Sequence, residues 1–363
     1  MEVKKIAVLR ANAMGDFIFA LPALQALRDT FLVAEIVYLG RPLHKELLAN
    51  RPGPVNRVIV VPDFPGITAA EGTEPNEAEL NKFFAEMQRE EFDIAIQMHG
   101  GGRNSNPFLL RLGAKLTVGL KTPDAAELDI SIPYTTYFSE ILRNLEVVSK
   151  IGAKTRHIQP RLEVIPQDIE AANKIINNPE GKPLAFIQPG ASDIRRQWPT
   201  ENFAAICDYL IEQGIHVCIS GAEFEIPIAE KIVSLMVYKN EVQNLCAKFS
   251  LSALIGVIAQ ADLVVSNDTG PLHVAYALQK PAVGIYWIGN MINGTPATSS
   301  LARPLLSWTL NCPLCGLSTT EFDTTHSTCD HKTSFVAEVK IEHVKAAVVD
   351  IMGWNIENLK QVV

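Results

Sequence analysis

The chain has 363 residues, of which 47% are hydrophobic, and its formal net charge is −8 at pH 7. This length suggests about two domains, and the acidic balance, without a basic face, argues against a nucleic-acid-binding protein. No apolar stretch reaches the roughly 18 residues of a membrane span. Because the first residues, MEVKKIAVLR, also lack the apolar run and cleavage site of a signal peptide, we expect a cytoplasmic protein. Peripheral contact with a membrane surface stays open, although the sequence offers no clear anchor for it.

Short apolar runs alternate with amphipathic segments along the chain. In the first half, strands are predicted at 4–10, 34–40, 55–62 and 92–100, and helices at 21–31, 42–50, 79–90 and 139–153. The same alternation returns in the second half, with strands at 183–190, 216–221, 262–268 and 281–287 and helices at 202–214, 226–237, 251–261 and 271–279. Strands separated by helices indicate βαβ units and a parallel sheet.

This pattern predicts an α/β protein with two Rossmann-like, doubly wound domains in tandem. We assign 1–165 to the N-terminal domain, 166–183 to a linker and 184–340 to the C-terminal domain, which includes a cysteine-rich loop at 311–332. The last amphipathic helix, within 341–363, is predicted to pack back on the N-terminal domain. Ligands of such sheets bind at the carboxyl ends of the strands, so we expect the site in a cleft that these ends face.

The first strand runs into RANAMGDFIFALPAL, which places Gly15 and Asp16 directly before an apolar helix. Glycine lets the backbone turn tightly or approach a ligand, and the positive field of a helix start stabilises a carboxylate. Two interpretations follow: Asp16 caps the helix, or it is an active-site carboxylate.

A second turn, SNDTGPLHVAYALQ, follows a buried strand and contains Pro271, a residue type favoured at the first position of a helix. The amides of Thr269 and Gly270 at this helix start predict an anion site suited to a diphosphate. Asp268 would then face away from the diphosphate and accept hydrogen bonds from sugar hydroxyls or turn amides, and the His273 ring would face the cleft. A capped helix with a partly buried histidine is the alternative.

Three segments, in the right order, resemble glycosyltransferase family 9, the heptosyltransferase family of lipopolysaccharide core assembly. SNDTGPLHVAYALQKPAVGIY resembles its C-terminal signature, RANAMGDFIFALPALQALR its N-terminal signature, and PGASDIRRQWPTENFAAICDYL its central motif. The resemblance covers nearly the whole chain. It implies the GT-B fold and an inverting, metal-independent transfer of a sugar from a nucleotide donor to an acceptor hydroxyl. The donor would bind the C-terminal domain and the acceptor the N-terminal domain.

The resemblance also implies roles for single residues. Asp16 stands where the family places its general base, which takes the acceptor proton. Arg196 matches the basic position that stabilises the departing diphosphate, where many members carry lysine, and Arg195 is its alternative. Glu225 falls where the family places an acid near the donor ribose, and Glu223 is its alternative. Donor binding is further assigned to Gly15, Asp268, Thr269, Gly270 and His273, and Gly15 would also make room for the acceptor.

The glycines after the strand at 92–100 match the family's acceptor-side loop more weakly. His99 and Arg103 are therefore candidates to bind acceptor hydroxyls or phosphates. A lone histidine after a strand is more often structural, which is the alternative for His99.

The segment NCPLCGLSTTEFDTTHSTCDHK has ligand spacing typical of zinc at Cys312, Cys315, Cys329 and His331, with His326 as a spare ligand. CPLCG resembles a knuckle turn, and some protein-directed members related to the family carry a cysteine-bound metal in this part of the chain. One interpretation is a structural zinc or iron ion with four protein ligands, and a loop of thiols without metal is the other.

The favoured function is transfer of a sugar, with heptose from ADP-heptose as the family default and no cofactor required for catalysis. The acceptor is open between lipopolysaccharide core, another glycan or lipid-linked sugar, and a protein side chain, at the cytoplasmic face of a bacterial inner membrane. A GT-B nucleotide-sugar epimerase or hydrolase is one alternative, disfavoured by the base turn at Asp16. A catalytically inactive sugar- or partner-binding member is the other, disfavoured because the catalytic and donor-site residues are retained.

Overall fold

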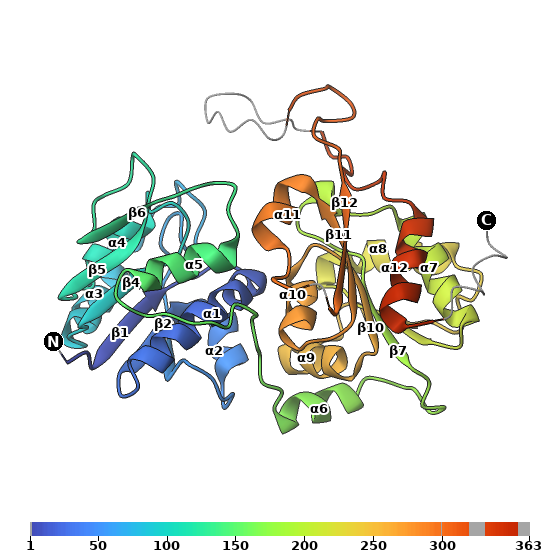
Figure 1. Ribbon diagram of the computed structural model, residues 1–363, viewed down its shortest axis with the longest axis horizontal. Coiled ribbons are helices and arrows are strands. Elements are labelled where there is room, and N and C mark those ends of the chain that lie inside the picture. The colour runs from blue at the N-terminus through green and yellow to red at the C-terminus, as the bar shows by residue number, and fades with distance from the viewer. Residues whose placement is uncertain (1, 299, 319–330, 355–363) are drawn as a thin grey trace. The chain divides into compact units, whose positions relative to one another are not determined.

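The computed structural model describes residues 2–298, 300–318 and 331–354. The chain divides into two compact units, Met1–Glu163 and Val164–Val363, each built on one sheet (Figure 1). The division falls close to residue 165, where the N-terminal domain was expected to end.

The sheet of unit 1 is six-stranded and parallel, in the order β3-β2-β1-β4-β5-β6. Its strands are β1 (Lys5–Leu9), β2 (Glu35–Gly40), β3 (Arg57–Val60), β4 (Ile94–Gln97), β5 (Leu116–Lys121) and β6 (Ile130–Pro133). Its helices are α1 (Met14–Thr30), α2 (Pro42–Leu48), α3 (Glu77–Arg89), α4 (Ser105–Leu110) and α5 (Glu140–Ser149). The strand order reverses between β1 and β4, and doubly wound sheets bind ligands at the carboxyl ends of such a strand pair.

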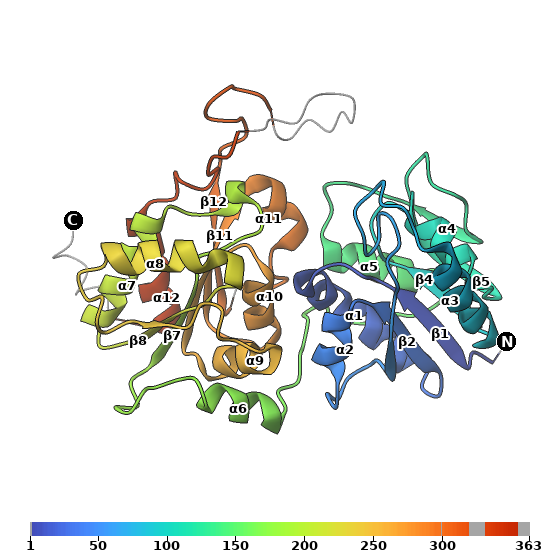
Figure 2. The same ribbon diagram turned by 180° about the vertical axis from the view of Figure 1, so that it is seen from behind.

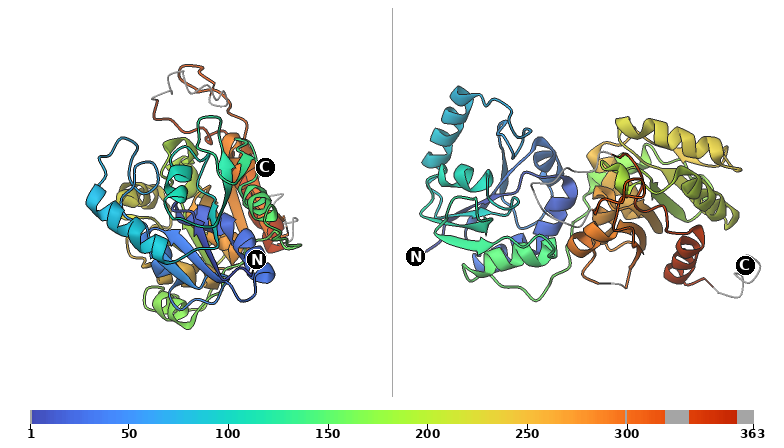
Figure 3. Two further views of the ribbon diagram at one scale, coloured as in Figure 1. Left: turned by 90° about the vertical axis from the view of Figure 1, so that its left-hand side faces the viewer. Right: turned by 90° about the horizontal axis from the view of Figure 1, so that it is seen from above.

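The helix α1 follows β1 directly and is apolar on almost every side. A helix of this kind must be buried rather than half exposed. Most residues of α1 are buried, and the helix lies side by side with α5 (Figures 1 and 3). Within the described residues, neither α1 nor any other helix combines the length and apolar character that crossing a bilayer requires.

Unit 2 repeats the topology with a six-stranded parallel sheet in the order β12-β11-β10-β7-β8-β9. Its strands are β7 (Leu184–Gln188), β8 (His216–Ile219), β9 (Gln243–Asn244), β10 (Leu263–Asn267), β11 (Ala282–Trp287) and β12 (Ala302–Ser307). Its helices are α6 (Pro166–Asn173), α7 (Thr200–Glu212), α8 (Ile226–Leu235), α9 (Leu251–Gln260), α10 (Gly270–Ala277), α11 (Ile288–Gly294) and α12 (Ile341–Met352), with 3₁₀ turns at Ile194–Arg196 and Glu223–Glu225. The predicted pair of doubly wound α/β domains is therefore confirmed.

Two expectations about the connecting segments are corrected. The stretch 166–183, expected to be a linker, begins with α6, which packs on α9 within unit 2. The helix α12, expected to pack on the N-terminal domain, instead lies against α7 and β12 of unit 2 (Figures 1 and 2). The reason is that Val344 and Val348, on one face of α12, are completely buried in the core of that unit.

The contact between α6 and α9 leads to a stability prediction. A Cβ added to Gly256 of α9 would lie 1.9 Å from the backbone carbonyl oxygen of Asp168. Gly256→Ala should therefore destabilise unit 2 by about 1–3 kcal/mol through overpacking, although alanine favours an isolated helix by about 1 kcal/mol over glycine. Urea unfolding of the variant should show a lower midpoint than wild type. Ser252→Ala on the same helix is the control and should not lower it. A Gly256→Ala protein at least as stable as wild type would contradict this packing.

Candidate functional site

In unit 1, the segments that follow β1 and β4 are joined at the carboxyl edge of the sheet. The Ala11 amide donates to Nδ1 of His99 at 3.1 Å, and the Tyr38 hydroxyl from β2 donates to the Arg10 carbonyl at 2.6 Å. These bonds fix the path of the chain from β1 into α1. They therefore hold the first turn of α1 at this edge.

The side chain of Arg10 is the centre of this edge, because its buried guanidinium makes five hydrogen bonds. Nε donates to the Asp16 carbonyl at 2.8 Å, and Nη2 donates to the Asp16 carboxylate and to Glu140 Oε2, both at 2.9 Å. Nη1 donates to the Met98 carbonyl and to Asn144 Oδ1. Burial works against the charged form, but the carboxylates of Asp16 and Glu140 outweigh it and raise the pKa of Arg10.

Asp16 is the solvent-accessible member of this group. Its side chain is 35% exposed, whereas that of Arg10 is 3% exposed. Its Oδ2 accepts the Ala13 amide at 3.3 Å, so it also caps the start of α1. Gly15, which was grouped with the donor-binding residues, is buried in the same turn of unit 1, beside Asp16. The two interpretations of Asp16 are thus compatible, because capping uses one oxygen and leaves the carboxylate accessible.

The two acceptor-side candidates lie in different surroundings. His99 is buried and accepts the Ala11 amide, and burial together with the nearby charge of Arg10 lowers its pKa to about 4. It is therefore a neutral imidazole near pH 7 that supports the turn before α1. Arg103 is exposed and lies 3.6 Å from carboxylate oxygens of both Glu71 and Asp124.

In unit 2, the turn after β10 is held against the loop after β7. Asn267 Oδ1 accepts the Trp198 amide at 3.1 Å, and its Nδ2 donates to the Pro189 carbonyl at 2.6 Å. Trp198 is itself buried and donates through its indole nitrogen to the Val339 carbonyl at 2.7 Å. The two loops therefore form one rigid edge at the carboxyl ends of β7 and β10.

Asp268 is the buried charge of this edge. Its Oδ1 accepts a hydrogen bond from His273 Nε2 at 3.0 Å, and its Oδ2 accepts one from Asn290 Nδ2 at 2.8 Å. Burial raises the pKa of an aspartate, but here the hydrogen bond from His273 and the charge of Arg196 outweigh it, so the pKa of Asp268 lies below its ordinary value. Its carboxylate therefore contacts the side chains of His273, Asn290 and Arg196, and the acceptance of hydrogen bonds from sugar hydroxyls stays a prediction. The His273 ring lies against Asp268 and is largely buried.

The two arginines of the IRRQWP segment have different partners. Arg196 donates to the Asp268 carbonyl at 3.1 Å and lies 3.7 Å from its carboxylate, with 22% of its side chain exposed. Arg195 folds onto Asp193 through several hydrogen bonds and lies over the ring of Trp287, 5.3 Å from its centroid. Of the two, Arg196 therefore reaches the turn at the start of α10.

The remaining donor-side candidates lie at the same edge. Thr269 precedes α10 in an extended conformation, and its side chain makes no capping hydrogen bond. The first backbone amides of α10 therefore have no capping side chain to donate to. Glu225 is buried after β8, where it accepts the Ala222 amide at 2.7 Å and the Gln188 side-chain amide at 3.3 Å. Glu223 is exposed. The buried member of the Glu223/Glu225 pair is thus Glu225.

The cysteine-rich segment begins as a tight hairpin at 311–318. The Cys312 amide donates to the Leu317 carbonyl at 2.8 Å, the Gly316 amide donates to the Cys312 carbonyl at 2.8 Å, and Gly316 has a φ of +73°. Only glycine adopts this conformation readily. The tight turn therefore holds Cys312 and Cys315 close together, as in a metal-binding knuckle.

Three of the four predicted ligands come together here. The ligand atoms of Cys312, Cys315 and His331 all lie within 4.8 Å of one another, and Cys312 Sγ is 3.6 Å from His331 Nδ1. Sulfur and nitrogen ligands of one tetrahedral zinc ion lie roughly 3.5–4 Å apart, given metal–ligand bonds of about 2.0–2.3 Å. The donor set fits a soft or borderline ion such as zinc or iron. Cys329 and the spare ligand His326 lie outside the described residues.

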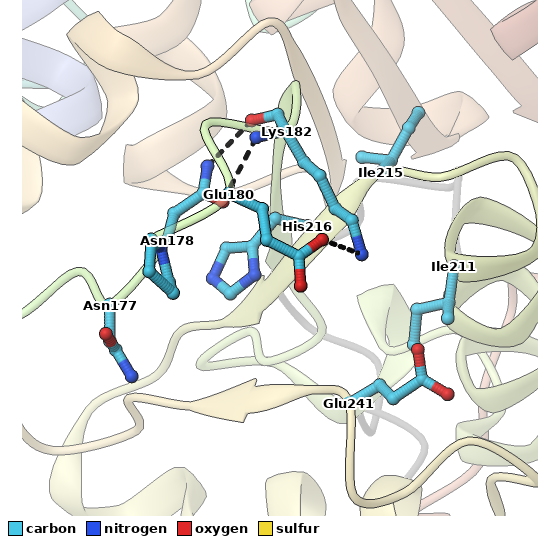
Figure 4. A pocket seen from close by; sticks show the side chains of 9 residues that line it. Asn177, Asn178, Glu180, Lys182, Ile211, Ile215, His216 and Glu241 are labelled. Carbon is cyan, nitrogen blue, oxygen red and sulfur yellow. Dashed lines mark hydrogen bonds and ion pairs between the residues drawn. The ribbon is translucent and has the colours of Figure 1, made fainter.

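A pocket of about 200 Å³ in unit 2 lies at the opposite edge of the sheet, where β7 and β8 begin (Figure 4). Its lining includes His216, Lys182 and Glu180, and the last two form an ion pair at 2.9 Å. Doubly wound sheets bind ligands at the carboxyl ends of their strands. We therefore do not assign this pocket to the reaction.

Sequence reasoning missed several residues that complete the two edges. Glu140 and Asn144 on α5 contact Arg10, and Asn290 on α11 contacts Asp268. Arg10 itself was visible only as the arginine of the N-terminal signature. The one available signal was its position, because a charged residue directly after a buried strand requires partners at that edge.

Comparison with known proteins identifies the family of this chain. The sequence profile described as glycosyltransferase family 9 (heptosyltransferase) matches residues 80–322. The lipopolysaccharide core heptosyltransferase OpsX of Haemophilus influenzae is 24% identical over 302 residues, which cover 81% of this chain and 82% of that protein.

Two solved structures share the fold. The glycosyl transferase family 9 protein of Veillonella parvula superposes with a TM-score of 0.77 at 19% identity, covering 97% of this chain and 98% of that one. The ADP-heptose lps heptosyltransferase II of E. coli superposes with a TM-score of 0.76 at 18% identity, covering 96% and 98%. The fold is GT-B, and because the profile matches more than half of the sequence, the chain belongs to glycosyltransferase family 9, the heptosyltransferase family.

Proposed function

We propose that this glycosyltransferase transfers heptose from ADP-heptose to a hydroxyl of a lipopolysaccharide core, with inversion at the anomeric carbon and without a catalytic metal ion. Membership of the heptosyltransferase family and the names of the relatives support the sugar, the donor and the class of acceptor. The observation that carries the mechanism is the accessible carboxylate of Asp16, paired with buried Arg10 at the ligand-binding edge of unit 1.

In the proposed step, the acceptor hydroxyl attacks the anomeric carbon of the donor while the bond from that carbon to the diphosphate oxygen breaks. The hydroxyl proton passes to the carboxylate of Asp16, and the electron pair of the broken bond stays on the diphosphate. A positioned carboxylate is suited to this task because the attacked carbon is oxocarbenium-like in the transition state. A single displacement of this kind inverts the anomeric configuration.

Unit 2 would stabilise the charge that develops on the leaving diphosphate. Arg196 provides a guanidinium that can bind phosphate oxygens in two places, and the helix start at Thr269 and Gly270 provides backbone amides. We assign Asp268 and His273 a positioning role, because Asp268 holds Arg196 and is itself held by the imidazole. Glu225 would accept hydrogen bonds from the donor ribose.

The proposal is tested by incubating the purified protein with ADP-heptose and heptose-deficient lipopolysaccharide core, and by measuring ADP release and the anomeric configuration of the product. Heptosylated core of inverted configuration supports it. Turnover of the donor without an acceptor would favour the epimerase or hydrolase alternative. Donor binding without any turnover would favour the inactive binding protein.

Asp16→Asn should abolish transfer, with kcat lowered by about 10²–10⁴-fold because the amide cannot take the acceptor proton. Binding of ADP, measured by titration calorimetry, should stay close to wild type, since the proposed donor site is in unit 2. The control is Asp29→Asn at the other end of α1, where the exposed carboxylate accepts a side-chain hydrogen bond from Gln25 at 2.7 Å. Wild-type turnover by Asp16→Asn would remove the base assignment.

Arg196→Ala should lower kcat/KM for the donor by roughly 10- to 150-fold, which corresponds to ~1.5–3 kcal/mol for a hydrogen bond to a charged group. Its neighbour is a matched control, because Arg195 is already engaged by Asp193. Arg195→Ala should therefore change donor kinetics much less. The reverse order of effects would transfer the phosphate-binding role to Arg195.

We further propose that Cys312, Cys315 and His331 bind a structural zinc or iron ion. Elemental analysis of protein purified without added metal should find about one ion per chain, and His331→Gln should lower both the metal content and the thermal midpoint. His343→Gln, an exposed histidine on α12, should change neither. Metal-free wild-type protein of full stability would exclude the ion.

A further inference from the structure

The carboxylate of Asp16 is the end of a chain of alternating charges that runs into unit 1. Arg10 Nη2 donates to Asp16 and to Glu140 at equal distances of 2.9 Å, so one nitrogen is shared between two carboxylates. The second oxygen of Glu140 accepts a bond from Arg143. The order of charges is therefore Asp16, Arg10, Glu140, Arg143, with signs that alternate.

The inner end of this chain is anchored. The side chain of Arg143 is 3% exposed. Its Nη1 donates to the Tyr134 hydroxyl at 3.1 Å, and its Nη2 donates to the carbonyls of Thr135 and, at 3.1 Å, Thr136. Its guanidinium also lies over the Tyr134 ring, 4.3 Å from the centroid. Arg143 therefore holds Glu140 in place, and Glu140 holds the guanidinium of Arg10.

From this arrangement we infer that Glu140 is a positioning residue for the transfer reaction, which fixes Arg10 against Asp16 and divides the charge of Arg10 between two carboxylates. The inference rests on the proposed function. A buried arginine paired with Asp16 alone would favour the charged carboxylate strongly and make it a poor proton acceptor. With Glu140 present, Arg10 orients Asp16 while part of its charge is compensated by Glu140.

The other charged and titratable groups around Asp16 come from three elements. Tyr38 of β2 is kept neutral because burial raises its pKa. His44 of α2 and His99 after β4 have their pKa values lowered to about 4, in each case mainly by burial. Arg41 adds a charge next to His44. All of them are present in every variant compared below, so a difference between pH profiles reports the change in the charge chain.

Two substitutions at neighbouring links of the chain should shift the pH profile in opposite directions. Glu140→Gln removes the competing negative charge, so kcat/KM should keep its value to lower pH, with the acid limb displaced by up to about one unit. Its kcat on the plateau should fall by roughly 3- to 10-fold because the base is weaker. Arg143→Met leaves the charge of Glu140 uncompensated and should displace the acid limb to higher pH.

The control is Glu146→Gln on the same helix, where the carboxylate forms an i,i+4 ion pair with Lys150 at 3.8 Å. It should reproduce the wild-type profile, and all three variants should bind ADP like wild type. Each protein is also returned from acidic buffer to pH 7 and assayed again. Activity lost through titration returns, whereas activity lost through irreversible unfolding does not.

A merely structural Glu140 would lower activity or stability without moving the acid limb, and that outcome overturns the inference, as does a shift of the same sign in both variants. If one variant fails to fold, the direction of the shift in the other still decides. The proposed function fails separately, when wild-type protein does not transfer heptose to the core.

Discussion

The buried guanidinium of Arg10 is the constraint on which the carboxyl edge of the sheet in unit 1 depends. A charge removed from water is costly unless its hydrogen bonds and its counter-charge are supplied by the protein. Here they are supplied by the first turn of α1, the end of β4 and two side chains of α5. Neutralising one cation therefore fixes the relative positions of three elements. It also leaves a carboxylate, that of Asp16, oriented and accessible.

In unit 2, the buried charge at the carboxyl edge of the sheet has the opposite sign. There the buried group is the carboxylate of Asp268, which is surrounded by His273, Asn290 and Arg196. The accessible group is the cation, since Arg196 is only partly covered. Two sheets of the same topology thus present opposite charges at their carboxyl edges. In the proposed transfer, the carboxylate would take the acceptor proton and the cation would bind the diphosphate.

Two histidines that are candidate binding groups also form hydrogen bonds within the protein. His99 supports the chain between β1 and α1 as a neutral imidazole, and His273 supports Asp268. Both histidines lie beside a turn at the carboxyl end of a strand, where a ring nitrogen hydrogen-bonds a neighbouring backbone amide or carboxylate. The hairpin at Cys312 also depends on its local backbone. Gly316 adopts a left-handed conformation in the turn, and the side chains of Cys312 and Cys315 lie close together there.

The sequence by itself determined the fold class, because the central strands of a parallel sheet are buried on both faces and read as short apolar runs. It also predicted the turns that precede α1 and α10, since glycine, proline and aspartate at a strand end have strong local preferences. It did not predict β5, β6, β9 or β12, most of which are short or lie at or near a sheet edge and lack a clear apolar run.

Only the tertiary structure decided how each site residue is held. It joined Glu140 to Arg10 across 130 positions of sequence, distinguished Arg196 from Arg195 and Glu225 from Glu223, and placed α6 and α12 in the core of unit 2. The physical reason is that periodicity and turn chemistry are local, whereas the partner of a buried charge depends on which distant loops the strand order brings to one edge.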